Sequence, residues 1–253
     1  KFVFSPIDLS YIDIEKDSVF AARLKEIDNT FLSNSYSAHL IPSSSIGYFY
    51  SNQDFEKNSN FMYLKLNLES AGNALKVLSQ PLKLNQNLDG NYQAFDVPFS
   101  QYVKVDFDLR FFEVLTQHYT IVYRGFGGIA VPLSNNSSIP FEKSFFAGGS
   151  NNQRAWTARS LGPGSINDTI SYRSFDQIGD VLLGANVEYR FDILKMVEGA
   201  VFIDAGNIWI QQKDNQRVGS DFDFKRFYKE IAIGAGIGAR LDFSFFIVRL
   251  DAG

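Results

Sequence analysis

The chain has 253 residues, of which 15% are aromatic and 21% charged, and its formal net charge is -4. No uninterrupted apolar run reaches the roughly 18 residues that a membrane-spanning helix requires, so a soluble globule or a transmembrane barrel remains. The acidic balance and the lack of a basic run exclude a nucleic-acid partner, and the lack of cysteine excludes disulfides and thiolate chemistry.

The N-terminal segment 1–12 favours a strand, and a helical pattern follows it. Within 13–36, apolar residues recur at helical spacing at Phe20, Leu24, Ile27 and Phe31. This spacing indicates a short amphipathic helix that packs over its neighbours or, as the less favoured alternative, binds a partner. The chain opens without a signal peptide and stops within a strand pattern, so we expect a mature protein or an internal fragment and favour the fragment.

Alternation of apolar and polar residues predicts strands along the rest of the chain. Between 102 and 112, for example, Val103, Val105 and Phe107 alternate with Lys104 and Asp106. The alternating segments are 62–69, 102–112, 119–131, 181–191, 201–209 and 231–241. Each is close to the roughly 9 to 11 residues with which a tilted strand crosses a bilayer.

The lengths of the connections distinguish a β-sandwich from a membrane barrel. A sandwich hides its apolar face in a core, whereas a barrel turns that face to lipid. Long connections at 13–37, 72–98, 132–180 and 211–228 alternate with short ones at 51–60, 114–117, 192–197 and 242–245. A membrane barrel sorts long loops and short turns to opposite ends, and a sandwich has no reason to do so. We therefore favour an all-β chain that forms an antiparallel transmembrane β-barrel.

Aromatic residues lie near the ends of several predicted strands. They fit the girdles that barrels place at the two membrane interfaces, although strands are also generally rich in aromatic residues. The girdle candidates are Tyr48, Tyr50, Tyr119, Tyr189 and Trp209.

The segment 145–165 separates two alternating strands with a Gly-rich, non-periodic loop that carries an arginine. Its turn-forming residues favour no regular element, so side chains and surroundings must hold the loop in place. We select Arg154 as the anchor. The other residues of the loop motif are Gly148, Gly149, Gln153, Ala155, Trp156, Gly162 and Pro163.

This loop, together with the later strand sequence Phe-Ile-Asp-Ala-Gly at 202–206, resembles the BamA/TamA superfamily of outer-membrane assembly factors, also called the bacterial surface antigen family. The resemblance implies a partial barrel of about nine strands with a long loop in its lumen. Residues 1–253 would form part of one outer-membrane β-barrel domain, its later strands, with the final strand and upstream periplasmic domains outside this chain. The implied location is the outer membrane of a Gram-negative bacterium.

The resemblance also pairs Arg154 with Asp204 through a charge-assisted, bidentate hydrogen bond that pins the loop inside the lumen. The residues alone favour a simpler arrangement, in which Asp204 faces lumen water and Arg154 extends into solvent. Ala155 stands where the family usually has glycine, and alanine does not readily adopt a positive φ, so the expectation rests chiefly on Arg154. The supporting lumen contacts would be Glu188, Phe202 and Gly206, with Glu188 contacting the loop or simply lining the lumen.

Gly234, Gly236 and Gly238 lie on one face of a predicted strand. No helix opens after them, so they do not form a dinucleotide-binding motif. Because glycines on one face leave space for a close neighbour, we expect the loop to pack near them, and ordinary barrel curvature is the alternative.

The sequence predicts no catalytic residues, cofactor site or metal site. His39 and His118 lie in different strands without cysteine partners or a His-Glu-x-x-His arrangement, which argues against zinc and favours interface or lumen positions. No Gly-x-Ser-x-Gly nucleophile elbow is present. We therefore expect no enzymatic activity from this chain.

The resemblance implies a barrel that helps other outer-membrane proteins insert and fold. An openable seam would offer unpaired strand edges to a client strand, whose backbone groups lipid cannot satisfy. The expected partners are the lipid bilayer, client outer-membrane proteins and accessory lipoproteins. The alternatives are a polypeptide secretion or translocation pore of the same superfamily and a membrane-anchor barrel for a fused lipase-like enzyme.

Overall fold

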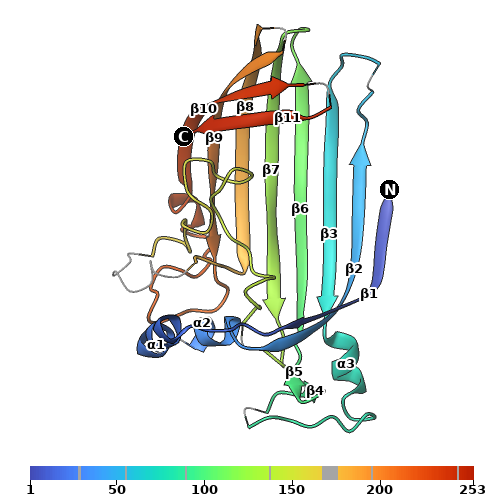
Figure 1. Ribbon diagram of the computed structural model, residues 1–253, viewed down its shortest axis with the longest axis vertical. Coiled ribbons are helices and arrows are strands. Elements are labelled where there is room, and N and C mark those ends of the chain that lie inside the picture. Colours follow the sequence, from blue (N-terminus) through green and yellow to red (C-terminus); the bar gives the residue numbers. More distant parts are fainter. Residues whose placement is uncertain are drawn as a thin grey trace.

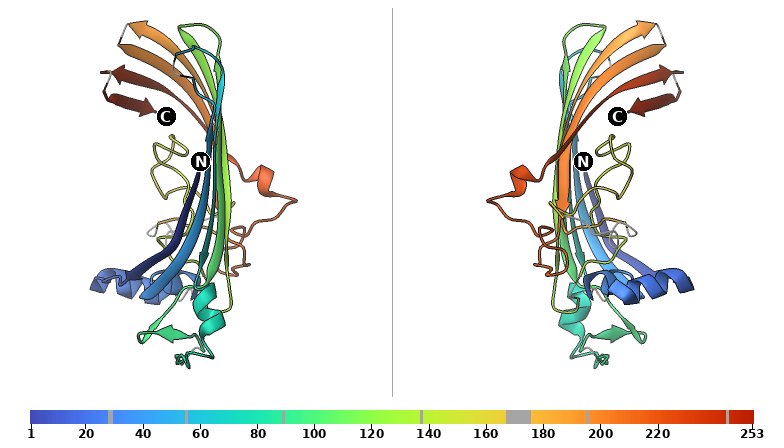
Figure 2. Two further views of the ribbon diagram at one scale, coloured as in Figure 1. Left: turned by 90° about the vertical axis from the view of Figure 1, so that its right-hand side faces the viewer. Right: turned by 90° about the vertical axis from the view of Figure 1, so that its left-hand side faces the viewer.

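A single curved sheet dominates the computed structural model, which describes residues 1–27, 30–54, 56–88, 90–136, 138–166, 176–194, 196–243 and 245–253 (Figure 1). Its strands follow the order β1-β2-β3-β6-β7-β8-β9-β10-β11, and each pairs antiparallel with its neighbours. The strands are β1 (Phe2–Ile12), β2 (His39–Ser51), β3 (Phe61–Ala71), β6 (Tyr102–Val114), β7 (Tyr119–Pro132), β8 (Val181–Leu194), β9 (Val197–Trp209), β10 (Ala232–Asp242) and β11 (Ile247–Ala252). The sheet is open, and its curvature is that of a partial barrel wall (Figure 2). The predicted fold class is confirmed.

The long connections gather at one end of the sheet and the short turns at the other, as the connection lengths predicted (Figure 1). The long connections carry α1 (Ser18–Ile27), α2 (Thr30–Ser35), α3 (Asn73–Leu78), the small strands β4 (Gln93–Ala94) and β5 (Val97–Pro98), and the 3-10 turn η2 (Phe227–Lys229). None of the described helices is both long and apolar enough to cross a membrane.

The helical pattern predicted after the first strand corresponds to α1 and α2. Leu24 and Tyr36 are buried there, and Phe20 packs against them together with Phe141 from the long loop after β7. The side chains of Ile27 and Phe31 lie outside the described part of the structure. Among the described residues, this segment therefore packs over the end of the sheet as the pattern favoured.

Alternation along the strands separates an exposed apolar face from a more buried polar face. In β6, Val105, Phe107 and Leu109 are exposed, whereas Asp106 and Asp108 on the opposite face are partly buried. A soluble sandwich would bury the apolar face, so this arrangement is the one expected of a wall that faces lipid outside and a lumen inside. The register from β3 to β7 runs without a shift, so each face continues across neighbouring strands.

The main hydrophobic core lies on the concave face, near the end that carries the long connections. It joins residues of five strands to the first part of the loop between β7 and β8, which lies on the concave side of the sheet in Figure 2. The buried members are Ile41, Ala71, Tyr102, Ala130, Ile139, Phe145, Ala147 and Ile208. Because its own apolar residues pack against the inner wall, this loop runs inside the lumen rather than out into solvent.

Candidate functional site

The backbone of the lumen loop turns sharply at glycines. Gly148 has a φ of 89°, and a Cβ there would lie 2.1 Å from the carbonyl oxygen of Thr157. Gly162 has a φ of 83° and would carry a Cβ 2.5 Å from Asn207 Oδ1, and a cis peptide bond joins it to Pro163. Positive φ and close backbone approach both require glycine, so the loop motif includes these residues for their conformation.

Arg154 and Asp204 lie in direct contact. Arg154 Nε donates to Asp204 Oδ2 at 2.9 Å and Nη2 donates to Oδ1 at 2.8 Å, which makes the pair bidentate. The backbone N–H of Arg154 also donates to Oδ2 at 2.9 Å. The guanidinium lies 3.4 Å from the ring centre of Phe202, so the planar cation is held on its edge by the acid and on its face by the ring.

Glu188 binds the same guanidinium and two further arginines. Its carboxylate accepts from Arg154 Nη1 at 2.5 Å, from Arg190 Nε at 2.6 Å and from Arg240 Nη2 at 2.5 Å. The side chains of Arg154, Asp204 and Glu188 are almost completely buried. Buried charges persist only when they are paired and hydrogen-bonded, and here each carboxylate has several donors.

The tip of the loop is held through its backbone carbonyls. Arg124 on β7 donates to Asn151 O at 2.6 Å, and Asn186 on β8 donates both to Asn152 O at 2.9 Å and to Asp204 Oδ1 at 2.7 Å. Side chains from β7 and β8 thus satisfy backbone carbonyl groups at the tip of the loop.

A further donor to the loop tip comes from β11, where Arg249 hydrogen-bonds to Ser150 O. The side chain of Gln153 is fully buried, accepts from Gly148 N at 3.1 Å and reaches Ala205 O at 3.5 Å. Hydrogen bonds from the wall and from within the loop therefore hold residues 150–153, directly before Arg154.

The loop packs tightly against two glycines of the wall. A Cβ on Gly206 would lie 1.9 Å from Gln153 Nε2, and one on Gly234 would lie 2.5 Å from the Cβ of Ala155 and 2.8 Å from the ring of Trp156. These positions leave the space that the loop fills.

At the other two glycines of the β10 row, the nearest neighbours are strand residues. Gly236 lies against the ring of Phe202 and the backbone of Ala252, and Gly238 lies against the Asp251 carboxylate and β11. The loop therefore packs against this face at Gly234, as expected, while at Gly236 and Gly238 the nearest atoms belong to β9 and to the β11 end of the chain.

A second attachment, which the sequence reading missed, ties the first part of the loop to β3. Lys143 Nζ and Glu69 Oε1 are 2.7 Å apart, and Tyr102 donates its hydroxyl to the same oxygen at 2.5 Å. Lys104 Nζ also donates to Lys143 O at 2.7 Å. The alternation along 62–69 places Glu69 on the lumen face of its strand. It does not give the path of the loop, so the sequence could not pair Glu69 with Lys143.

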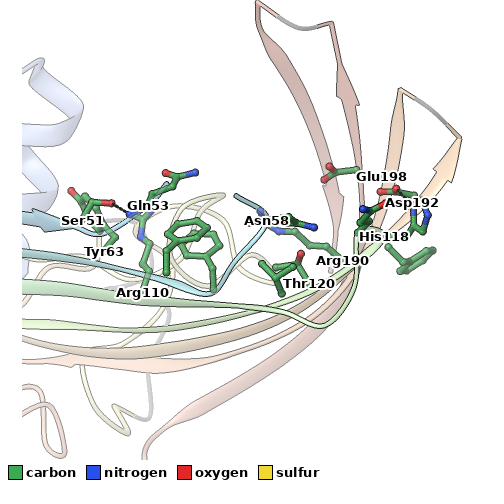
Figure 3. Close-up of a pocket in the computed structure, with 15 residues that line it drawn as sticks. Ser51, Gln53, Asn58, Tyr63, Arg110, His118, Thr120, Arg190, Asp192 and Glu198 are labelled. Carbon is green, nitrogen blue, oxygen red and sulfur yellow. Dashed lines mark hydrogen bonds and ion pairs between the residues drawn. The ribbon is translucent and has the colours of Figure 1, made fainter. Parts of the chain in front are cut away.

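A polar cavity of about 500 Å³ opens in the lumen near the short turns (Figure 3). Its lining includes Ser51, Tyr63, Arg110, Thr120, Arg190 and Glu198. His118 lies at its edge, 2.8 Å from Asp192, while His39 lies at the opposite end of the barrel, 3.4 Å from Glu142. Among the residues that the structure describes, no group of three His, Cys, Asp or Glu side chains is arranged to hold a metal ion.

The sequence that forms this curved wall and its arginine-anchored lumen loop matches a known protein family. The model of the Omp85 superfamily domain matches residues 40–253. The chain belongs to the Omp85 superfamily. The Omp85 match places it in the outer membrane of a Gram-negative bacterium and among barrels of outer-membrane protein assembly and translocation. It also confirms the resemblance seen in the loop and in the Phe-Ile-Asp-Ala-Gly strand.

A solved structure has the same fold as this Omp85 chain. The crystal structure of BamA from Haemophilus ducreyi lacking POTRA domains 1–3 superposes with a TM-score of 0.59 at 15% sequence identity. The alignment covers 99% of this chain and 48% of that one, so this chain spans about half the length of the matched structure. The likeness is one of fold. A search of curated protein sequences gives no significant match.

Proposed function

We propose that this chain forms part of the barrel of an assembly factor that helps other outer-membrane proteins insert and fold. Residues 1–253 would belong to one barrel domain of a longer protein, and no cofactor is needed for the proposed activity. Omp85 membership supports the general role. The proposed role requires lipid and client outer-membrane proteins as partners, together with accessory lipoproteins in the full assembly.

The observation that carries the proposal is the anchoring of the lumen loop by Arg154. Its guanidinium joins Asp204 on β9 to Glu188 on β8, and the neighbouring loop residues bind β7 and β11. Contacts that span these strands from inside stiffen this part of the wall. A stiff wall would let another part of the barrel open and present unpaired strand edges to a client, since lipid cannot satisfy a client's backbone groups.

The test uses cells in which the native gene is depleted and the full-length protein is supplied as wild type, Arg154→Ala or Arg154→Lys. Lysine keeps the charge but loses the bidentate geometry, so both variants are expected to lower the amounts of many folded barrel proteins, with alanine the more severe. Lys57→Ala, which removes an exposed ion pair at a short turn, serves as the control and should support normal levels.

Quantitative comparison of outer membranes separates the candidate roles. A decrease in many unrelated barrel proteins supports assembly. Loss of one secreted protein, with barrel proteins at normal levels, would overturn assembly in favour of a secretion pore. A hydrolase domain with a Gly-x-Ser-x-Gly elbow upstream in the full-length chain, with no effect of depletion on barrel proteins, would instead indicate a membrane anchor.

A further inference from the structure

The connection between β9 and β10, residues 210–231, folds over the outer face of the barrel. Trp209 shares the outward face of β9 with Val201 and Ile203, yet it is completely buried while those two are about half exposed. Phe222 and Phe227 cover it, with ring centres 5.4 and 6.4 Å from the Trp209 ring. Figure 2 shows this segment on the convex side of the sheet, opposite the lumen loop.

Hydrogen bonds fix this segment, here called the outer loop, to the wall beneath it. Glu230 accepts from Trp209 Nε1 at 2.6 Å and lies 3.1 Å from Arg226 Nε, and its backbone oxygen accepts from Asn207 Nδ2 at 2.6 Å. Arg226 also pairs with Asp221 at 2.8 Å. Trp209 therefore does not lie in an exposed aromatic girdle, as its place at a strand end suggested, because the outer loop takes the outward position.

The outward side of the outer loop presents two aromatic side chains and two lysines. Phe224 is 81% exposed and Tyr228 is 59% exposed. They are four residues apart in a turn closed by the hydrogen bond from Phe227 N to Asp223 O at 2.9 Å, and both are exposed while Phe222 and Phe227 pack against Trp209.

Each exposed aromatic residue is followed directly by an exposed lysine. Lys225 and Lys229 form no ion pair with any residue that the structure describes, although the Lys229 ammonium lies 5.8 Å from the ring centre of Tyr228. Aromatic rings beside long basic side chains are the combination found where a protein meets the boundary between lipid tails and headgroups.

The exposed aromatic pair continues the lipid-facing surface of the barrel. Tyr228 lies just before β10, whose outward residues Ile233 and Ile237 are 70% and 65% exposed. We propose that the outer loop is a membrane anchor that inserts Phe224 and Tyr228 into the interface of the outer leaflet, the side on which membrane barrels carry their long loops. Lys225 and Lys229 then extend toward anionic headgroups, as long basic side chains do at membrane boundaries.

Single cysteines test this proposal cleanly, since the chain contains none of its own. Phe224→Cys and Tyr228→Cys are made in the full-length protein, in which any cysteine outside these 253 residues is replaced by serine. The variants are labelled with an environment-sensitive fluorophore and reconstituted into vesicles of phosphatidylcholine and phosphatidylglycerol. Spin-labelled lipids, with the label near the headgroup or near the chain end, then report depth. Ile203→Cys on the lipid-facing wall and Leu88→Cys, fully exposed in the connection between β3 and β6, are the matched controls.

The proposal requires at least about twofold stronger quenching at both aromatic positions than at Leu88, with the headgroup label the more effective quencher. At Ile203 the chain-end label should be the more effective one. Quenching at both aromatic positions as weak as at Leu88, in protein that retains the heat-modifiable migration of a folded barrel, would overturn the proposal. To exclude an effect of the dye, Phe224→Trp is measured with brominated lipids against Leu88→Trp, after subtraction of the wild-type signal from Trp156 and Trp209, and equal quenching of the two added tryptophans would also overturn the proposal.

Discussion

Glu69 on β3 and Lys143 in the lumen loop form an ion pair 2.7 Å long, at a point in the loop that precedes Arg154 in the sequence. Tyr102 shares the Glu69 oxygen, and both charged side chains are largely buried. The loop is therefore attached to the inner wall at two separate places, one near its start and one near its tip.

Replacement of Lys143 with methionine should loosen the start of the loop. The apolar stem is kept, but the Glu69 carboxylate loses a cation in a buried site, which costs about 1–3 kcal/mol. Hydrogen exchange of the backbone amides of residues 138, 139 and 141–147 should speed up accordingly, whereas Lys57→Met at an exposed turn should leave it unchanged. Unchanged exchange in Lys143→Met would show that the ion pair does not hold the loop.

A methyl group at Gly206 should push the loop away from the wall. Its Cβ would lie 1.9 Å from Gln153 Nε2 and close to the backbone of Leu183 and Gly184, so Gly206→Ala is expected to cost about 1–3 kcal/mol. Gly125→Ala is the matched control, because nothing lies within 4 Å of its Cβ position. Urea unfolding in detergent compares the two, and equal stabilities would contradict the tight contact.

Stability should fall as the pH rises from about 4 to 6 because of Asp180, which lies just before β8. Burial raises the pKa of its carboxyl from 3.8 to about 6, against the opposing effects of the Gln211 N–H and Arg217. A group whose pKa is higher in the folded than in the unfolded protein stabilises the fold fully at a pH below its unfolded pKa. That stabilisation, here about 3 kcal/mol, is lost as the pH rises through the folded pKa.

Asp180→Asn should remove most of this pH dependence and raise stability at neutral pH. Asp180 Oδ1 has no hydrogen-bond partner among the described residues, so replacing that oxygen with the amide nitrogen of asparagine breaks no hydrogen bond. Urea unfolding between pH 4 and 7, with Asp54→Asn at an exposed turn as control, measures the effect. Parallel pH profiles for wild type and Asp180→Asn would contradict a raised pKa.

The strands and their faces were predictable because alternation reports the face of each residue directly. The segment predicted at 102–112 lies within β6, and its apolar positions Val105, Phe107 and Leu109 are the exposed ones. The order of long and short connections likewise identified the end of the sheet that holds the loops. Both signals are local, so a single sequence carries them.

Contacts between distant segments were less predictable, because they depend on register and on the path of the loops. Arg154 and Asp204 could be matched only through a family resemblance, and nothing local linked Lys143 to Glu69 or Arg240 to Glu188. Trp209 was misplaced for a related reason: the outer loop that covers it is irregular and gives no periodic signal.

A double-mutant cycle of Arg154→Ala and Asp204→Ala tests the loop anchor most directly. Urea unfolding of the four proteins is measured in the same detergent, with an equivalent cycle on the exposed pair Lys57 and Asp54 as control. The bidentate, buried contact predicts a coupling energy of about 1–3 kcal/mol for Arg154 and Asp204 and almost none for the control. Additive effects of Arg154→Ala and Asp204→Ala would contradict an anchored loop.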